Sequence, residues 1–186
     1  MLNVILETCA GTLTQGLIYA ILSYGIFITY KILDFPDLTV DGSFPLGAAV
    51  TAVLLTHGVN AWLTLPIALV IGALAGLCTG LIHVRARVRD LLAGIITMTA
   101  LYSINLQIAG SNLMVERAID TIYTSAPVMA LLGSVPLLYR KLIVSLVLVV
   151  LIGLVLEWYF STKNGLLLRA VGDNDTLAVS YTHLRA

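Results

Sequence analysis

Residues 42–82 form a run of 41 positions in which His57 is the only Asp, Glu, Lys, Arg or His side chain. A helix of about 20 apolar residues crosses the hydrocarbon core of a bilayer, so this run has the length of two membrane spans. We expect the break between them near residues 57–60. Over the whole chain 59% of the residues are hydrophobic and 11% are charged, whereas ordinary soluble domains carry about 25% charged residues. A soluble core of this size could not hide so much apolar surface. The composition therefore predicts an all-α, polytopic membrane protein.

Charged residues mark the ends of three further apolar segments. Residues 8–30 contain 23 uncharged positions and predict the first span, and residues 91–109 predict the fourth. The aliphatic residues 142–156, extended by the aromatic residues 158–160, predict the fifth. Residues 110–139 are more polar and predict an extramembrane connection with room for a short surface helix. We therefore expect about five transmembrane helices.

Lysine and arginine positions favour one orientation, since short cytoplasmic loops are enriched in both residues. If the arginines of residues 85–89 are cytoplasmic, alternation of the spans also places Lys31, Lys163 and Arg169 there, six basic residues in all. The opposite side then receives three, which are Arg117, Arg140 and Lys141. This distribution favours an external N-terminus, although the adjacent pair at 140–141 argues the other way.

Residues 34–44 read DFPDLTVDGSF and place Asp34, Asp37 and Asp41 between the first two apolar segments. An aspartate at the bilayer centre costs roughly 2.5–3.5 kcal/mol on insertion scales, so these carboxylates need water, a cavity or a partner. One interpretation is a short aqueous loop between spans. The other is a broken or re-entrant segment near residues 34–47 that lines a polar pathway, because non-helical backbone at membrane depth is tolerated only there. The residues alone leave both interpretations open, with Asp34 the most simply interfacial of the three.

The fourth span is unusually polar for a helix that faces lipid. Thr99, Tyr102, Ser103 and Asn105 fall within two helical turns. Such side chains either form hydrogen bonds between helices or contribute to a substrate passage.

The third span holds three glycines, Gly72, Gly76 and Gly80, at a spacing of four residues. A row of glycines on one helix face lets another helix approach closely. The row predicts helix packing, either inside this chain or at a subunit interface.

Motifs of enzyme chemistry are missing from the sequence. The chain has no G-x-x-x-x-G-K-[ST], H-E-x-x-H or G-x-S-x-G pattern, and its three histidines are scattered. We therefore expect no enzyme activity, no catalytic residue, no metal site and no cofactor. The net charge of zero, without a basic block, gives no support for nucleic-acid binding.

Three segments together resemble a known family: DFPDLTVDGSFPLGAA, LLAGIITMTALYSIN and NGLLLRAVGDN. They are similar to permease subunits of bacterial ABC importers of the branched-chain amino acid and ribose superfamily, and most similar to its tryptophan/tyrosine transport system permeases. The resemblance implies a multi-pass subunit of the bacterial plasma (inner) membrane that moves a small solute, such as an amino acid, inward by alternating access. It also implies three partners: a cytosolic ATP-binding subunit that drives transport, an extracytoplasmic solute-binding protein and a second permease subunit, with a homodimer as the expected arrangement.

The resemblance also assigns roles to residues of this chain. The matching stretch of the superfamily forms a broken segment near the translocation path, which gives Asp37, Thr39 and Asp41 an expected place in that path. Ser43 of the same segment and Asn105 of the polar fourth span complete the expected translocation pathway. The third motif matches the cytoplasmic region that meets the ATPase, with Gly165, Arg169, Gly172 and Asp173 as the expected coupling residues. A coupling element of this kind must transmit nucleotide-driven closure to the spans.

The end of the chain departs from the family pattern. Family members continue for several spans after the GDN motif, and the last residues, VSYTHLRA, resemble a translated sequencing adapter. We expect residues 1–178 to be the N-terminal part of a longer permease domain, truncated at its C-terminus, and residues 179–186 to be a non-native tail. Two rival functions stay open: an ion-coupled secondary transporter that uses Asp37 or Asp41, and a membrane scaffold without transport. No residue pattern identifies the solute.

Overall fold

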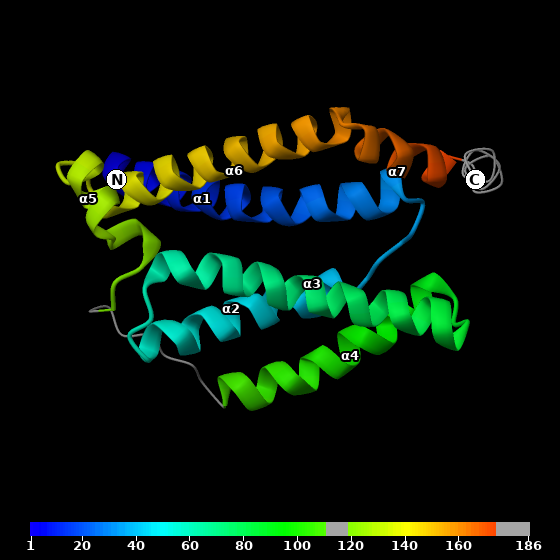
Figure 1. The fold of residues 1–186 in the computed structure, drawn as a ribbon. Helices are drawn as coiled ribbons and strands as arrows, with labels where there is room; N and C mark the ends of the chain where they lie inside the picture. Colours follow the sequence, from blue (N-terminus) through cyan, green and yellow to red (C-terminus); the bar gives the residue numbers. More distant parts are fainter. Residues whose placement is uncertain (111–118, 174–186) are drawn as a thin grey trace. The chain divides into compact units, whose positions relative to one another are not determined.

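The computed structural model describes residues 1–110 and 119–173, and within these ranges every regular element is helical (Figure 1). The all-α prediction is confirmed. Four segments are long and apolar enough to cross a membrane, namely Val4–Ile32, Ala61–Ala86, Asp90–Ala109 and Leu137–Ser161. A fifth apolar helix, Val40–Thr56, has 17 residues. At 1.5 Å per residue it is about 26 Å long, at the lower limit for a span.

The described residues divide into two compact units. Unit 1 combines residues 1–36 with 138–173, and unit 2 contains residues 37–110 and 119–137. The division falls inside the aspartate-rich stretch, between Pro36 and Asp37. Asp34 therefore belongs to unit 1, whereas Asp37 and Asp41 belong to unit 2.

Unit 1 is built on two long helices that lie side by side and run in the same direction (Figure 1). They are α1 (Leu2–Phe27), which continues into the π-helical turn η1 (Ile28–Ile32), and α6 (Leu137–Ser161). Asp34 follows η1 with a φ of 50°, a left-handed conformation that aspartate tolerates better than most residues. The helical path of the first span therefore ends here. A short helix, α7 (Lys163–Asp173), carries the third motif, follows α6 and contacts η1.

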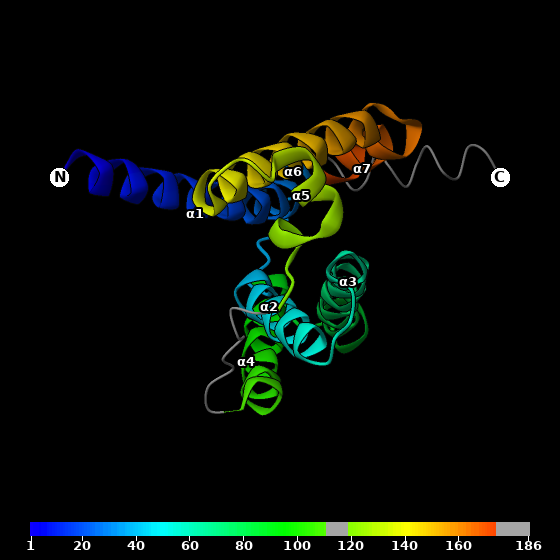
Figure 2. The same cartoon turned by 90° about the vertical axis from the view of Figure 1, so that its left-hand side faces the viewer.

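Unit 2 is centred on three mutually packed helices, which Figure 2 shows nearly end on. They are α2 (Val40–Thr56), α3 (Ala61–Ala86) and α4 (Asp90–Ala109). The buried core consists of one side chain from each helix, Leu46, Ala75 and Leu101. The 3₁₀ turn η2 (Ile122–Thr124) and the short helix α5 (Ala126–Leu132) follow, so the expected short helix in the connection is present.

The helix ends of unit 2 lie where the charge and turn pattern predicted them. Asn60 begins α3 by accepting a hydrogen bond from the Trp62 N–H at 3.0 Å, the usual role of an asparagine at this position. Gly58, with a φ of 78°, makes the turn before it. At the other end, Arg87 has a φ of 54° and ends α3.

The irregular stretch near residues 34–47 is shorter than the sequence suggested, because α2 already begins at Val40. Pro45 lies inside α2 rather than before it. A proline removes one intrahelical bond, here the one that the Asp41 carbonyl would accept from residue 45. This position is close to the helix start, so the helix continues with a local loss only.

Candidate functional site

The residues just before α2 form a turn that uses Asp37. Its Oδ1 accepts a hydrogen bond from the Thr39 N–H at 2.8 Å, while the Asp41 N–H donates to the Leu38 carbonyl at 3.3 Å. Asp37 thus closes an Asx turn that leads into the helix. Its carboxylate therefore has a structural role through the Thr39 N–H, whether or not it also lines a pathway.

Thr39 is held by a buried hydroxyl pair. Its Oγ1 lies 2.6 Å from Oγ1 of Thr79 on α3, and the two residues are only 2% and 1% exposed. Thr79 also donates to the Ala75 carbonyl at 3.3 Å, so Thr39 is the donor within the pair. Thr39 therefore anchors the segment to α3 and is closed to solvent. The sequence analysis missed Thr79, although it continues the buried face of α3 one turn after Ala75.

A glycine on α4 makes room for the same segment. An ideal Cβ built on Gly94 would lie 2.9 Å from the Leu38 nitrogen and 3.5 Å from Oδ1 of Asp37. Real Cβ atoms essentially never come that close to a backbone nitrogen. Residues 37–39 are thus clamped between Thr79 of α3 and Gly94 of α4. Gly94 lies inside the second family-like motif, but its spacing alone gave no sign of this role.

One turn further along, α2 and α4 are joined through Asn105. Its Nδ2 donates to the Gly42 carbonyl at 3.1 Å, and Gly42 is buried against Met98 and Leu101. The Oδ1 atom of Asn105 is buried and has no hydrogen-bond partner among the described residues. Leaving a buried acceptor without a donor costs about 1–3 kcal/mol. The contact between these helices therefore contains an unsatisfied polar group.

A cavity of about 460 Å³ lies beside this contact, between α2 and α4. We call it the α2–α4 cavity. Its lining comes from one face of each helix: Asp41, Gly42, Pro45, Ala49, Met98, Thr99, Tyr102, Asn105, Leu106 and Ala109. Asp41 is exposed and is the only charged residue of this lining.

The five expected pathway residues therefore separate into groups. Asp41 and Asn105 line the α2–α4 cavity, whereas Asp37 and Thr39 hold the start of α2. Ser43 is half-buried and its hydroxyl donates to the Val40 carbonyl of its own helix at 3.4 Å. The pathway role of all five remains a prediction, and Asp41 and Asn105 are the members that line a cavity.

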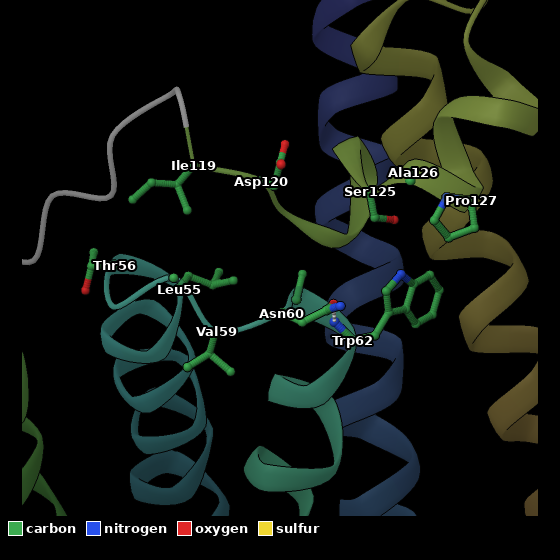
Figure 3. A pocket seen from close by; sticks show the side chains of 12 residues that line it. Leu55, Thr56, Val59, Asn60, Trp62, Ile119, Asp120, Ser125, Ala126 and Pro127 are labelled. Carbon is green, nitrogen blue, oxygen red and sulfur yellow. Dashed lines mark hydrogen bonds between the residues drawn. The ribbon is translucent and has the colours of Figure 1, made fainter.

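A second cavity of unit 2, of about 610 Å³, lies at the turn between α2 and α3 (Figure 3). Asn60 and Trp62 form one side, and Asp120, Ser125 and Pro127 form the other. Its lining combines amide, carboxylate, hydroxyl and indole groups, a mixture that matches no single class of ligand. This cavity lies at the end of α3 remote from the arginines of residues 85–89.

The expected coupling residues lie on α7, which packs tightly in unit 1. A Cβ on Gly172 would meet the Ile32 carbonyl oxygen directly, and one on Gly165 would meet the Tyr159 carbonyl oxygen. The Arg169 guanidinium carbon lies 5.2 Å from the centre of the Phe160 ring, within the range of a cation–π contact. Asp173 is the last residue of α7. The opposite side of α7 leaves Leu166 and Leu167 more than half exposed.

No other part of unit 2 packs closely against the glycine row on α3. Ideal Cβ atoms on Gly72, Gly76 and Gly80 would have no non-neighbouring atom within 4 Å. Helix packing at this row stays a prediction. Among the described residues, no group of three or more His, Cys, Asp or Glu side chains is arranged to hold a metal ion.

Comparison with known proteins assigns the chain to a family. A family model described as the branched-chain amino acid transport system permease component matches residues 8–181. A tyrosine transport system permease protein of Clostridioides difficile is 34% identical over 170 residues, which are 91% of this chain and 54% of the relative. An uncharacterised protein of Rickettsia prowazekii is 34% identical over 172 residues, 90% of this chain and 55% of the relative.

The chain thus spans about half the length of the curated relatives it matches. No solved structure matches it. The family match covers both units and all of the helices described above except residues 2–7 of α1. With four helices among the described residues long and apolar enough to span a bilayer, the chain is a multi-pass membrane protein and belongs to the family of permease components of branched-chain amino acid transport systems.

Proposed function

We propose that the chain is part of the permease subunit of an ABC importer that moves an amino-acid-type solute inward across the bacterial plasma membrane. The observation that carries this proposal is the family match over residues 8–181. The relative named as a tyrosine transport system permease makes an amino acid the first solute to test. Transport proceeds by alternating access, with ATP hydrolysed on a separate cytosolic subunit and solute delivered by an extracytoplasmic binding protein.

The surface of α7 supports an ATPase partner. Leu166 and Leu167 are exposed on a helix whose glycines press against the ends of α1 and α6. A short amphipathic helix of this kind fits a groove on a partner protein. The other side of α7 packs tightly against α6 at Gly165 and against η1 at Gly172. A displacement of α7 by a partner would therefore move both long helices of unit 1.

The start of α2 supports a pathway in unit 2. The residues before α2 are held by one hydrogen bond to α3 and by close approach to α4, and the exposed carboxylate of Asp41 follows within the first turn of α2. A charged carboxylate costs free energy inside a membrane segment, so its presence there indicates a function. The same carboxylate would also fit the rival function, a secondary transporter that binds a cation at Asp41.

The test is uptake in proteoliposomes that contain the permease, the ATPase and the binding protein encoded with it. Radiolabelled tyrosine should accumulate with ATP present, and accumulation should survive an uncoupler. An ATPase whose P-loop lysine is replaced should abolish uptake. Uptake that stops with the uncoupler and persists without ATP would identify the ion-coupled transporter instead, and a membrane scaffold would give no uptake under either condition.

A further inference from the structure

The polar wall of the α2–α4 cavity has more hydrogen-bond acceptors than donors. The Thr99 hydroxyl donates within its own helix, to the Ile95 carbonyl at 3.0 Å or the Ile96 carbonyl at 2.9 Å, which leaves its oxygen with acceptor capacity. The Tyr102 hydroxyl and the second N–H of Asn105 are the donors that remain. A solute group that supplies several N–H donors would complement this wall.

Asn105 contributes an acceptor whose direction is chemically fixed. The Gly42 carbonyl accepts only from an N–H, so the amide nitrogen must face Gly42 and Oδ1 must face away from it. That Oδ1 is buried without a donor. Because this atom has almost no accessible surface, a donor reaches it only when the groups around it move.

Asp41 contributes the charge. Its carboxylate has no hydrogen bond or ion pair to any of the described residues, and it is the only charged group lining the cavity. Pro45, which also lines the cavity, cannot donate to the backbone carbonyl of Asp41. The rest of the lining is largely apolar and includes Met98 and Leu106.

We propose that the α2–α4 cavity binds the ammonium group of the transported solute, with Asp41 as its charge partner and Asn105 as a second acceptor. The proposal rests on the transport function proposed above and names the solute chemistry that this part of the pathway reads. The ammonium group first meets the exposed carboxylate. It satisfies Oδ1 of Asn105 once α2 and α4 have moved apart, so the bound solute favours the separated arrangement over the closed one. The hydrocarbon part of the solute lies against Met98 and Leu106.

The test uses the full chain purified in detergent, without ATPase or binding protein, and three phenolic probes. Tyramine carries an ammonium group, 3-(4-hydroxyphenyl)propionate carries a carboxylate, and p-cresol carries neither. Thermal unfolding is followed while each probe is titrated. Tyramine should raise the unfolding temperature in a saturable way, and the other two probes should not.

Two variants and one control locate the site. Asp41→Asn should weaken the apparent affinity for tyramine by about tenfold or more, because it removes a charged acceptor. Asn105→Leu should weaken it by about fivefold, as expected for one neutral hydrogen bond. Asp120→Asn removes a carboxylate from the other cavity of unit 2 and should leave the affinity unchanged. If Asn105→Leu does not fold, the exposed residue Asp41 still decides the question.

Equal stabilisation by p-cresol or by the carboxylate probe would overturn the proposal, as would an Asp41→Asn variant that binds tyramine normally. An equal loss in Asp120→Asn would also overturn it. ATP-driven tyrosine uptake with no amine selectivity in the purified chain would refute this inference and leave the transport function intact. Amine-selective binding without any uptake would refute the transport function and leave the ammonium site intact.

Discussion

The start of α2 is held by a threonine pair as well as by one of the three aspartates of the segment before it. Thr39 and Thr79, forty positions apart in the chain, form a buried hydroxyl pair with an oxygen–oxygen distance of 2.6 Å. Asp37 closes the turn before the helix, and Asp41 and Asn105 line the α2–α4 cavity. Of the residues expected to form one pathway, two therefore hold the start of α2 and two line a cavity.

The hydroxyl pair gives the first prediction. Thr79→Val keeps the shape of the side chain but leaves the buried Thr39 hydroxyl without its acceptor, so we expect a loss of about 1–3 kcal/mol in stability. The double variant Thr39→Val/Thr79→Val removes both polar groups and should recover most of that loss. Thr12→Val, at an exposed threonine that bonds only to its own helix, is the matched control. Thermal unfolding in detergent measures all three, and additive losses in the double variant would contradict the pairing.

A second residue-scale prediction concerns Gly94. Its ideal Cβ lies 2.9 Å from the Leu38 backbone nitrogen, and a backbone atom cannot move aside as the end of a side chain can. Gly94→Ala should therefore displace residues 37–39 and destabilise the protein by about 1–3 kcal/mol, the usual range for overpacking. Gly47→Ala on α2, where a Cβ meets nothing within 4 Å, should be neutral or slightly stabilising. Equal unfolding temperatures for the two variants would contradict the close approach at Gly94.

At the scale of elements, α7 stands out because its two sides have different surroundings. One side packs against Ile32 and Tyr159 through glycines, and the other exposes two leucines. The family resemblance assigned this motif a coupling role but not its contact with the end of the first span, because the motif contains no information about which distant residue it meets. The coupling role stays a prediction, and the close fit at Gly172 is the contact at which it can be tested.

Gly172→Ala tests that role. The added methyl group cannot fit against the Ile32 carbonyl, so α7 must shift away from η1. In proteoliposomes with ATPase and binding protein, we expect tyrosine uptake per ATP hydrolysed to fall at least about tenfold, while membrane insertion stays normal. Arg169→Glu should act in the same direction, because it removes the cation from the Phe160 ring. Gly11→Ala, at an open site of α1, is the control. Unchanged coupling in Gly172→Ala would refute the role of this contact.

For the whole molecule, the sequence predicted the helical elements better than their packing. Span ends near residues 57–60 and 83–90 followed from charges, turn residues and apolar length, which act locally. The roles of Thr79 and Gly94 and the division into two units depend on which helices pack together. One sequence on its own does not contain this information. The irregular stretch is also shorter than Pro45 indicated, because a proline near a helix start costs only one hydrogen bond. The glycine row on α3 and residues 179–186 stay predictions, the latter lying outside the described residues.

The orientation of the whole molecule provides the last prediction. With the arginines of residues 85–89 in the cytoplasm, Asp120 should be extracellular, and the last residue of α3, Ala86, should be cytoplasmic together with Lys163. The 26 residues of α3 separate its two ends by about 39 Å, enough to place them on opposite sides of a bilayer. Single-cysteine variants at the three positions, made after replacing the exposed Cys9 and Cys78 by alanine, are treated with an impermeant maleimide on intact cells. Asp120→Cys should react at once, whereas Ala86→Cys and Lys163→Cys should react only after permeabilisation. The reverse pattern would invert the orientation and move Leu166 and Leu167 away from the cytosol, so that α7 could no longer meet an ATPase.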